Sequence, residues 1–565
     1  MKLSILTYPL SLTLLLSTHV ALGQTKKDAQ PTNDKKTKAE QSRGTISEEI
    51  DVVRPYKPSF AEAVKIRINP DLTNNPTFRP NLIYTVLDKT LQIDSNITKL
   101  QSQKLFEDKV AIPTNNYIKA AIGNLNTTLG ELYLNNGKDE ALQVGLAIKH
   151  LAQQGNINKQ QFSRQEATLF GRNISNGATL DGHFTYNRLQ TYFYGLDPAI
   201  ASTVTSPAQQ QFNLFEARGG LQSNYKQGKQ FGYKLDATGY LLNNHFDAKE
   251  NNLFVSASLN QAINKVNFGA QAAIDVTKSE DVSYTINNNI FRAHPYAKIK
   301  GNNASLNFGL YIIQQYGMQN KSYLFPTASI NFPLAKSYVT IFAGANGDVI
   351  KASLRELANE NPYLNTNAAI TNTIEKLNIY AGIKGNAGHA LGFKATAFYK
   401  QIENMQLFQN SPSAADRFDV IYDPGQSKVL GIMGELELKA STIFSLINKI
   451  QVNNYTMANE QKAWFKPALR LTSIAQSHVT KRLSLNAEVV FNSQTYAKTV
   501  NTSTAEVEAV RINDYVDLNA GAEFQFAPQA RVYLQATNIL GTTNQQYLYY
   551  SKLGLGIFGG LKFSF

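Results

Sequence analysis

The chain has 565 residues and a net charge of +13, with 17% of its residues charged and 10% aromatic. A soluble protein of this length usually carries more charge, roughly a quarter of its residues, and divides into several domains. The Lys and Arg residues are scattered without a recognition motif, so the charge does not predict nucleic-acid binding. The sequence contains no Cys, which excludes stabilisation by disulfides.

Residues 1–23 have the features of a secretory signal peptide. Lys2 precedes an apolar run, and Ala21-Leu22-Gly23 forms a small-x-small cleavage site. Residues 24–47 are polar and lack periodic hydrophobicity, which predicts a disordered tether. No later stretch approaches the roughly 18 uninterrupted apolar residues of a membrane helix, so any membrane-spanning part must use strands.

Residues 48–114 predict a short N-terminal segment. It opens with an acidic and hydrophobic run, Glu48 to Arg54, followed by Pro55 and Pro58. A short helical piece is predicted over Ser59 to Ile68, and the apolar stretch Asn81 to Leu87 has the composition of a strand. The segment is too short for a large domain.

Residues 115–565 predict an all-β fold, a transmembrane antiparallel β-barrel of about 22 strands. Two-faced segments of roughly 9 to 15 residues alternate with turns rich in Gly, Asn, Pro and Lys. One face is apolar, and the other carries groups that tolerate water but not lipid. We expect polar residues of this second face to line a lumen and to contribute to selectivity, namely Glu488, Asn492, Asp517 and Glu523.

The lengths of the connections support a barrel. Bacterial barrels keep short turns on the periplasmic side and long loops outside. Long connections are predicted after odd strands, at Pro198 to Gln210, Lys278 to Asn288, Ile350 to Asn372, Phe408 to Asp419, Gln494 to Ile512 and Asn538 to Lys552. Short ones are predicted after even strands, at Lys226 to Lys229, Pro333 to Lys336, Asn386 to Ala390 and Ala527 to Gln529.

The final stretch, Leu553 to Phe565, predicts the last strand of the barrel. Its apolar face consists of Leu553, Leu555, Ile557, Leu561, Phe563 and Phe565. Phe558 breaks the alternation. Because the chain stops on an aromatic residue, as bacterial outer-membrane barrels do, Phe563 and Phe565 are candidates for the signal read by the barrel-assembly machinery. A soluble propeller or β-solenoid is the alternative, but no repeat with a fixed period is visible.

No constellation for catalysis or metal binding is visible. The sequence lacks Gly-x-Ser-x-Gly, a phosphate loop and a zinc signature, and its seven His residues are scattered. We therefore expect no catalytic, cofactor-binding or metal-binding residues, and no enzyme activity. Two aromatic clusters, Tyr192 to Tyr194 and Tyr547 to Tyr550, are interpreted as membrane-interface girdle residues, with an external ligand platform as the alternative.

Two stretches resemble TonB-dependent outer-membrane receptors. The first, Leu354 to Met405, begins with Asn361, Pro362 and Leu364 in an external loop that precedes a long hairpin. The second runs from Asp514 to Phe565 and contains Asn538-Ile539-Leu540 and Tyr547. The resemblance implies a 22-stranded barrel in the outer membrane of a Gram-negative cell. Receptors of that family carry a plug of well over a hundred residues, whereas only about 65 residues lie between Glu48 and the first predicted strand.

The run Glu49, Ile50, Asp51, Val52, Val53 and Arg54 is similar in place and character to the family's TonB box. The resemblance implies that it adds as a strand to a TonB-like periplasmic protein, by β-augmentation. A short strand packed in this protein's own lumen is the alternative. The function implied is uptake of an unidentified nutrient; the alternatives are an envelope scaffold or a passive porin with its lumen filled by the N-terminal segment.

Overall fold

The computed structural model describes residues 116–136, 141–197, 206–224, 231–301, 303–335, 338–388, 390–439, 441, 443–501 and 504–565. The signal peptide, the tether, the 48–114 segment and the Glu49 to Arg54 run predicted above lie outside these residues. No helix in the described ranges is long and apolar enough to cross a membrane.

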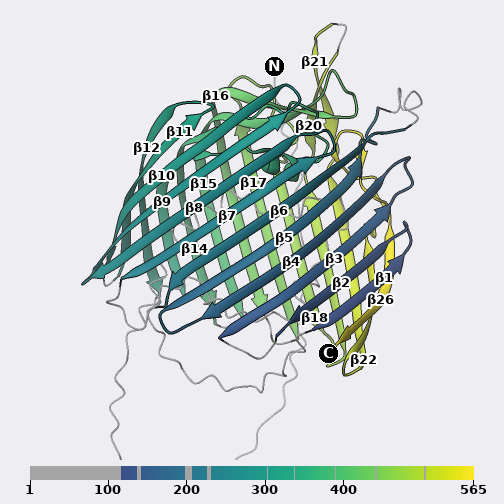
Figure 1. The fold of residues 1–565 in the computed structure, drawn as a ribbon, viewed down its shortest axis with the longest axis horizontal. Helices are drawn as coiled ribbons and strands as arrows, with labels where there is room; N and C mark the ends of the chain where they lie inside the picture. Colours follow the sequence, from purple (N-terminus) through teal and green to yellow (C-terminus); the bar gives the residue numbers. More distant parts are fainter. Residues whose placement is uncertain are drawn as a thin grey trace, which may run out of the picture. The chain divides into compact units, whose positions relative to one another are not determined.

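The described chain forms one closed antiparallel sheet of 22 strands (Figure 1). Each strand pairs with its neighbours along the chain, and the first strand pairs with the last, Tyr117 lying opposite Ser564. The strands of this sheet are β1 (Tyr117–Gly123), β2 (Thr128–Asn135), β3 (Leu142–Gln154), β4 (Gln161–Ile174), β5 (Ala178–Tyr192), β6 (Gln209–Ser223), β7 (Gly232–Asn244), β8 (Lys249–Ile263), β9 (Val266–Asp281), β10 (Tyr284–Lys300), β11 (Ser305–Gly317), β12 (Lys321–Ala335), β13 (Val339–Ile350), β14 (Thr373–Ala387), β15 (Leu391–Asn410), β16 (Phe418–Lys439), β17 (Phe444–Thr456), β18 (Leu469–His478), β19 (Leu483–Asn492), β22 (Tyr515–Ala527), β23 (Ala530–Thr537) and β26 (Gly556–Ser564). The predicted count of strands is confirmed.

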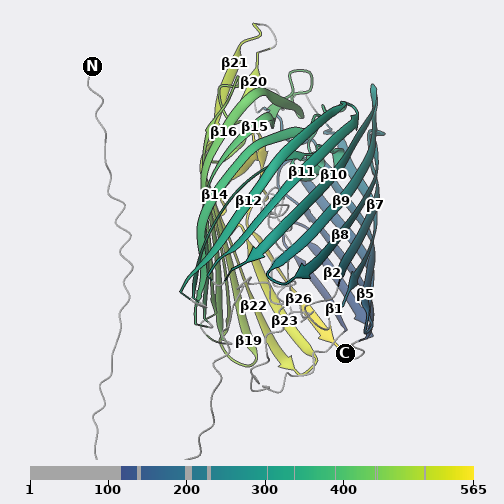
Figure 2. The same cartoon turned by 90° about the vertical axis from the view of Figure 1, so that its left-hand side faces the viewer.

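The other elements of the described chain lie in the connections. One short helix, α3 (Leu354–Glu360), follows β13. Two small hairpins, β20 (Thr495–Val500) with β21 (Val507–Ile512) and β24 (Gln545–Tyr547) with β25 (Tyr550–Ser551), follow β19 and β23. The β20–β21 hairpin projects from one end of the barrel (Figure 2).

The predicted long connections after β5, β13, β19 and β23 are confirmed. All four leave from the same end of the barrel, here called the loop end. The opposite end, called the turn end, carries short turns such as that between Ala527 and Ala530. The prediction was wrong for Lys278 to Asn288, because β9 and β10 continue to Asp281 and Tyr284 and join in a tight turn. A further long connection, residues 457–468, was not predicted.

Alternation of side chains gives the barrel an apolar outside. On β26, Leu561 is 60% exposed and points outward with Ile557, Phe563 and Phe565, as predicted. Phe558 is 2% exposed and packs inside with Ala121, Leu129 and Tyr533, which explains why it breaks the pattern. Leu553 was assigned to the outward face, but it precedes the strand and is buried.

Exposed aromatic residues gather near the turn end of the strands. Aromatic side chains are enriched at the edge of the hydrocarbon layer, so such a girdle of exposed aromatic residues marks a membrane interface. Its members are Phe231, Tyr233, Phe268, Phe308, Phe332, Tyr338, Phe524, Phe526, Phe563 and Phe565. The lipid-facing stretch above this girdle on β8 runs from Ile263 to Leu253, which matches the roughly 9–11 residues of a transmembrane strand.

Candidate functional site: a loop folded into the barrel

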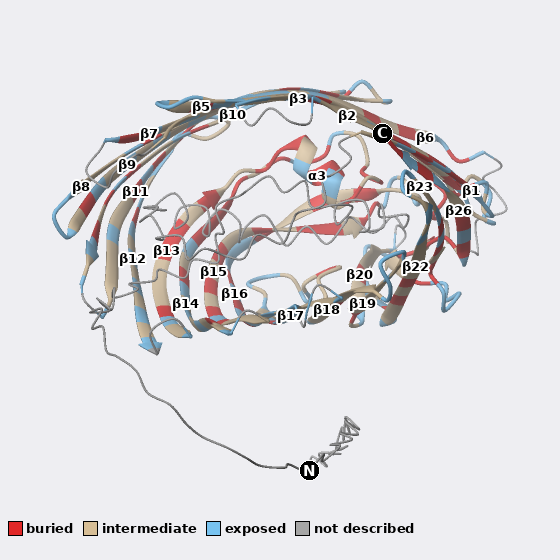
Figure 3. Cartoon of the chain, turned by 90° about the horizontal axis from the view of Figure 1, so that it is seen from below, coloured by how far each residue is buried: buried red, intermediate tan, exposed pale blue. Residues whose placement is uncertain are grey.

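Residues 351–372, which join β13 to β14, fold back between the barrel walls instead of extending away from them. Viewed from the turn end, α3 and the segments around it lie inside the ring of strands, and many of their residues are buried (Figure 3). We call residues 351–372 the cap loop. Its local structure explains how it is held in this position.

The N-terminus of α3 is completed by a side chain of the barrel wall. The first N–H groups of a helix have no partners within the helix. Ser353 serves as the N-cap and accepts a hydrogen bond from Glu356 N (3.1 Å). The carboxylate of Glu250, on β8, accepts hydrogen bonds from Leu354 N (2.7 Å) and Arg355 N (3.0 Å). The helix therefore begins where the wall supplies an acceptor.

Glu250 also connects the helix to the two neighbouring strands. Its carboxylate accepts hydrogen bonds from Tyr240 Oη on β7 (2.9 Å) and Ser279 Oγ on β9 (2.6 Å). Together with the two backbone donors of α3, four groups share this buried carboxylate. Because charge-assisted hydrogen bonds are the stronger class, this is a firm attachment of the cap loop to the wall.

The two ends of the cap loop are joined to each other and to β10. Asn288 donates to Asn372 Oδ1 (2.7 Å) and to the carbonyl of Ala352 (2.9 Å). Asn372 in turn donates to Asn288 Oδ1 (2.8 Å) and accepts from Ala352 N (2.9 Å). At the start of the loop, Lys351 forms an ion pair with Asp275 of β9.

The C-terminal end of α3 contacts the opposite side of the barrel. Glu360 forms an ion pair with Lys466 (2.6 Å), from the connection between β17 and β18, and accepts a hydrogen bond from Gln406 of β15 (3.1 Å). Tyr547 Oη donates to the carbonyl of Glu360 (2.5 Å). The cap loop is thus attached to strands on both sides of the barrel.

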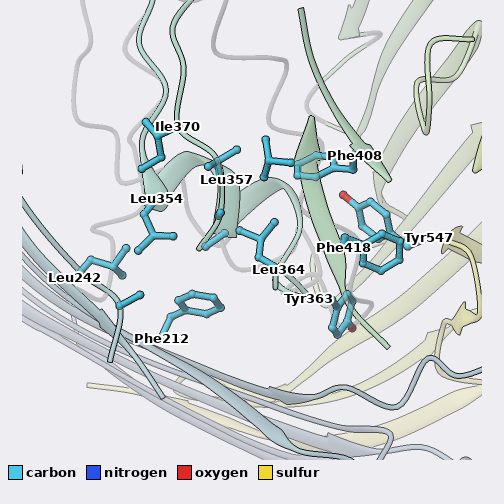
Figure 4. Close-up of a cluster of buried hydrophobic side chains, with 14 of the residues drawn as sticks. Phe212, Leu242, Leu354, Leu357, Tyr363, Leu364, Ile370, Phe408, Phe418 and Tyr547 are labelled. Carbon is cyan, nitrogen blue, oxygen red and sulfur yellow. The ribbon is translucent and has the colours of Figure 1, made fainter. Parts of the chain in front are cut away.

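The buried face of the cap loop packs into an apolar core at the loop end (Figure 4). Leu354, Leu357 and Ala358 of α3 are its centre, and side chains from strand walls and from other connections surround them. The surrounding residues include Phe193, Phe212, Leu242, Tyr363, Leu364, Ile370, Phe408, Phe418, Tyr547 and Tyr550. Tyr363 stacks on Tyr550, with ring centroids 3.7 Å apart.

The other face of α3 is charged. Arg355 forms an ion pair with Glu216 of β6 (2.5 Å) and lies 4.6 Å from the centre of the Tyr240 ring. The Glu356 side chain reaches solvent, although protein atoms surround most of it. Desolvation, together with the nearby carboxylates of Glu250 and Asp275, raises the pKa of Glu356 from 4.5 to about 7, against the opposing effect of Lys351 and Arg355.

The predicted loop motif lies in the cap loop. Asn361 ends α3, its N–H donating to the Leu357 carbonyl (2.8 Å), and its side chain accepts from Tyr363 N (3.0 Å). Leu364 forms a parallel β-bridge with Phe418 of β16 and is buried. Pro362 lies between these two. The motif therefore shapes the turn that carries the chain from the helix into the apolar core.

The girdle interpretation was wrong for most of the two aromatic clusters, although Tyr192 lies on the outward face of β5. Phe193, Tyr194, Tyr547 and Tyr550 are buried in the core around the cap loop and not exposed on the outside of the barrel. An aromatic residue near a loop has the same local sequence whether it packs in a core or lies in a girdle, so no local pattern separates the two. The residues that hold the cap loop, Glu250 above all, were also missed, because each lies on a strand far along the chain from residues 351–372.

The predicted lumen residues face inward, and most are paired. Asp517 forms an ion pair with Lys552 (3.1 Å), Glu523 with Arg531 (3.0 Å), and Glu488 accepts from Asn519 (3.3 Å). Asn492 is buried. These contacts make the side chains part of the inner wall. Phe563 and Phe565 are exposed on the outside, with ring centroids 6.1 Å apart.

Among the residues that the structure describes, no three His, Asp or Glu side chains are grouped so as to hold a metal ion. The described histidines are separate from one another. His294, for example, is buried against the ring of Tyr311, at a centroid distance of 4.1 Å.

Solved structures with the same architecture are outer-membrane receptors. No protein-family model matches the sequence, and no curated protein matches it. The FrpB iron transporter of Neisseria meningitidis superposes with a TM-score of 0.61 at 8% identity, covering 80% of this chain and 82% of that one. FpvA of P. aeruginosa bound to heterologous pyoverdines superposes with a TM-score of 0.60 at 12% identity, covering 80% of this chain and 71% of that one. The siderophore receptor PirA of Acinetobacter baumannii superposes with a TM-score of 0.59 at 11% identity, covering 80% of this chain and 80% of that one.

The chain has the barrel fold of TonB-dependent outer-membrane receptors. The resemblance seen in the sequence is confirmed at the level of the fold. The receptor-like barrel and its lipid-facing belt place the protein in the outer membrane of a Gram-negative cell. The neighbours are transport receptors and not enzymes.

Proposed function

We propose that this protein takes up a nutrient across the outer membrane, and that the cap loop is the gate at its external entrance. The observation that carries the proposal is the position of residues 351–372 inside the barrel, attached to both sides of the wall. A loop that lay only on the surface would need neither the buried apolar core nor the hydrogen bonds to the Glu250 carboxylate.

Passage through the barrel requires the cap loop to move. Its contacts are of two kinds, a buried apolar core and a set of hydrogen bonds and ion pairs with the walls. Water and solute that displace the loop must replace those polar contacts, so a nutrient with hydrogen-bonding groups would be favoured over an apolar one. Siderophores, the ligands named for PirA and for the pyoverdine-bound FpvA, are the first class to test.

The test of the gate is conductance of the full chain in a planar lipid bilayer. Wild-type protein should be closed for most of the time. A variant in which residues 352–371 are replaced by a short Gly-Ser linker should give a stable open pore. A silent linker variant that is correctly folded would overturn the gate and favour the envelope scaffold, whereas an open wild-type pore would favour a passive porin.

We further propose that the Glu49 to Arg54 run couples uptake to a TonB-like periplasmic protein. Pairing of a strand needs backbone donors, and proline removes them. Crosslinking to the periplasmic TonB domain should therefore be lost in an Ile50→Pro, Val52→Pro double variant while conductance is unchanged. Failure of the wild-type protein to crosslink would leave the gate standing and remove the coupling.

A further inference from the structure

A band of polar side chains crosses the outside of the barrel just above the apolar belt. On β5, Arg188 and Gln190 lie on the same face as the exposed Phe184. On β6, Gln211 and Asn213 lie on the same face as the exposed Phe215. Residues of the opposite parity at this height, Thr191, Gln210 and Phe212, are buried inside. Arg188 and its neighbours therefore face the membrane side and not the lumen.

The position of this band marks the end of the hydrocarbon at the loop end. Arg188, Asn213 and Asn243 lie opposite one another on β5, β6 and β7. The next outward positions toward the turn end are Tyr186, Phe215 and Leu241, of which Phe215 and Leu241 are exposed and apolar. A change from apolar to fully polar residues within one step is typical of the level of lipid headgroups.

The side chains of the band are ordered by hydrogen bonds to one another. Arg188 Nη2 donates to Gln211 Oε1 (2.8 Å) and to Gln190 Oε1 (3.1 Å). Gln211 donates to Asn213 Oδ1 (3.1 Å), and Asn213 donates to Asn243 Oδ1 (2.9 Å). A surface held this way is preorganised, so a ligand that binds it loses little side-chain entropy.

Donors remain for a ligand. Arg188 makes both of its hydrogen bonds among the described residues through Nη2, which leaves Nη1 for a ligand, while its Nε is buried. Lys159, in the turn before β4, lies 5.2 Å from the ring centre of Tyr192, the outward residue that follows Gln190 on β5. Two cations and several amides thus face the same part of the membrane surface. Further along the band, on β9, Glu280 is paired with Lys278.

We propose that Lys159, Arg188, Gln190, Gln211 and Asn213 bind the phosphorylated sugar headgroup of a glycolipid in the outer leaflet. The loop end faces outward because bacterial barrels keep their long loops outside. A guanidinium and an ammonium recognise phosphate oxygens, and carboxamides exchange hydrogen bonds with sugar hydroxyls. The acyl chains of the same lipid would lie on Phe184, Phe215 and Leu241 below the headgroup site. This binding does not depend on transport.

The experiment uses full-length protein in phosphatidylethanolamine nanodiscs, with bound lipid counted by native mass spectrometry. The probes are a bisphosphorylated, acylated glucosamine disaccharide, its dephosphorylated form and phosphatidylglycerol. Wild-type protein should retain the bisphosphorylated glycolipid preferentially. An Arg188→Gln, Lys159→Gln variant should retain about tenfold less, which corresponds to about 1.4 kcal/mol.

Arg218→Gln is the matched control. Arg218 is the same type of residue on β6 but has the opposite parity, facing the lumen 3.8 Å from Asp236, so retention should not change. Equal retention of the dephosphorylated lipid, or of phosphatidylglycerol, by wild-type protein would overturn the proposal. If the double variant fails to fold, as judged by heat-modifiable migration in gels, Gln190→Leu keeps the Arg188–Gln211 bond and should still lower retention. Unchanged retention in a folded variant would also overturn it.

Discussion

Glu250 is the residue through which the barrel wall holds the cap loop. A carboxylate can accept all four of its hydrogen bonds, whereas a carboxamide has one acceptor oxygen and turns an NH₂ group toward donors. Glu250→Gln should therefore weaken the closed loop by about 1–3 kcal/mol, the range for leaving buried donors unsatisfied. Single-channel recording should show longer open times.

Glu280→Gln is the matched control for this variant. Glu280 lies on the neighbouring strand and is exposed on the outside of the barrel, away from α3. Its substitution should leave the open time unchanged. Equal gating in Glu250→Gln and wild-type protein would mean that the wall contact does not hold the gate.

Glu356 gives the cap loop a pH dependence. Its pKa is raised from 4.5 to about 7 in the closed loop, so the closed state favours the protonated carboxyl. Ionisation of the Glu356 carboxyl costs more free energy in the closed state than in an open state in which the carboxyl is solvated. The closed loop is therefore most stable below pH 4.5, loses stability as the pH rises toward 7, and changes little above that. Open probability should rise over this interval in wild-type protein and stay constant in Glu356→Gln.

At the scale of the element, we expect substitutions in α3 to destabilise the cap loop without destabilising the barrel. Leu357 is fully buried in the apolar core, and truncation of such a leucine typically costs about 2–5 kcal/mol. Leu357→Ala should make the loop sensitive to proteases while the barrel keeps its heat-modifiable migration. Asn359→Ala, on the exposed face of the same helix, should do neither. Simultaneous loss of barrel and loop would show that they fold as one unit.

The sequence was sufficient for the strands but not for the cap loop, for a physical reason. Outward residues such as Leu561 and Phe563 follow a period of two that is visible locally, and connection lengths are read directly along the chain. The position of residues 351–372 depends instead on contacts between distant positions. Glu250 and Leu354 are 104 residues apart, and Glu360 and Tyr547 are 187 apart. No local pattern identifies such partners.

At the scale of the whole molecule, closure of the barrel depends on the seam between β1 and β26. Gly560 lies opposite Ala121 in this seam, and a Cβ atom at Gly560 would come within 1.9 Å of the Ala120 carbonyl oxygen. Backbone cannot yield in the way that the end of a side chain can, so the two strands would have to separate. Gly560→Ala should therefore leave a barrel that does not close, while strands far from the seam still pair.

The neighbouring glycine allows a direct comparison. A Cβ atom at Gly559 would approach the Tyr533 carbonyl oxygen at 3.2 Å, a contact that a small adjustment relieves. Gly559→Ala should insert into outer membranes. Its migration in gels should change on heating, as that of the folded wild-type barrel does. Gly560→Ala should lack the heat-dependent change in gel migration that a closed barrel shows. Normal closure of both variants would mean that the two strands lie further apart at the seam than the pairing of Ala121 with Gly560 implies. Strand register would then close the barrel without close approach of the two backbones.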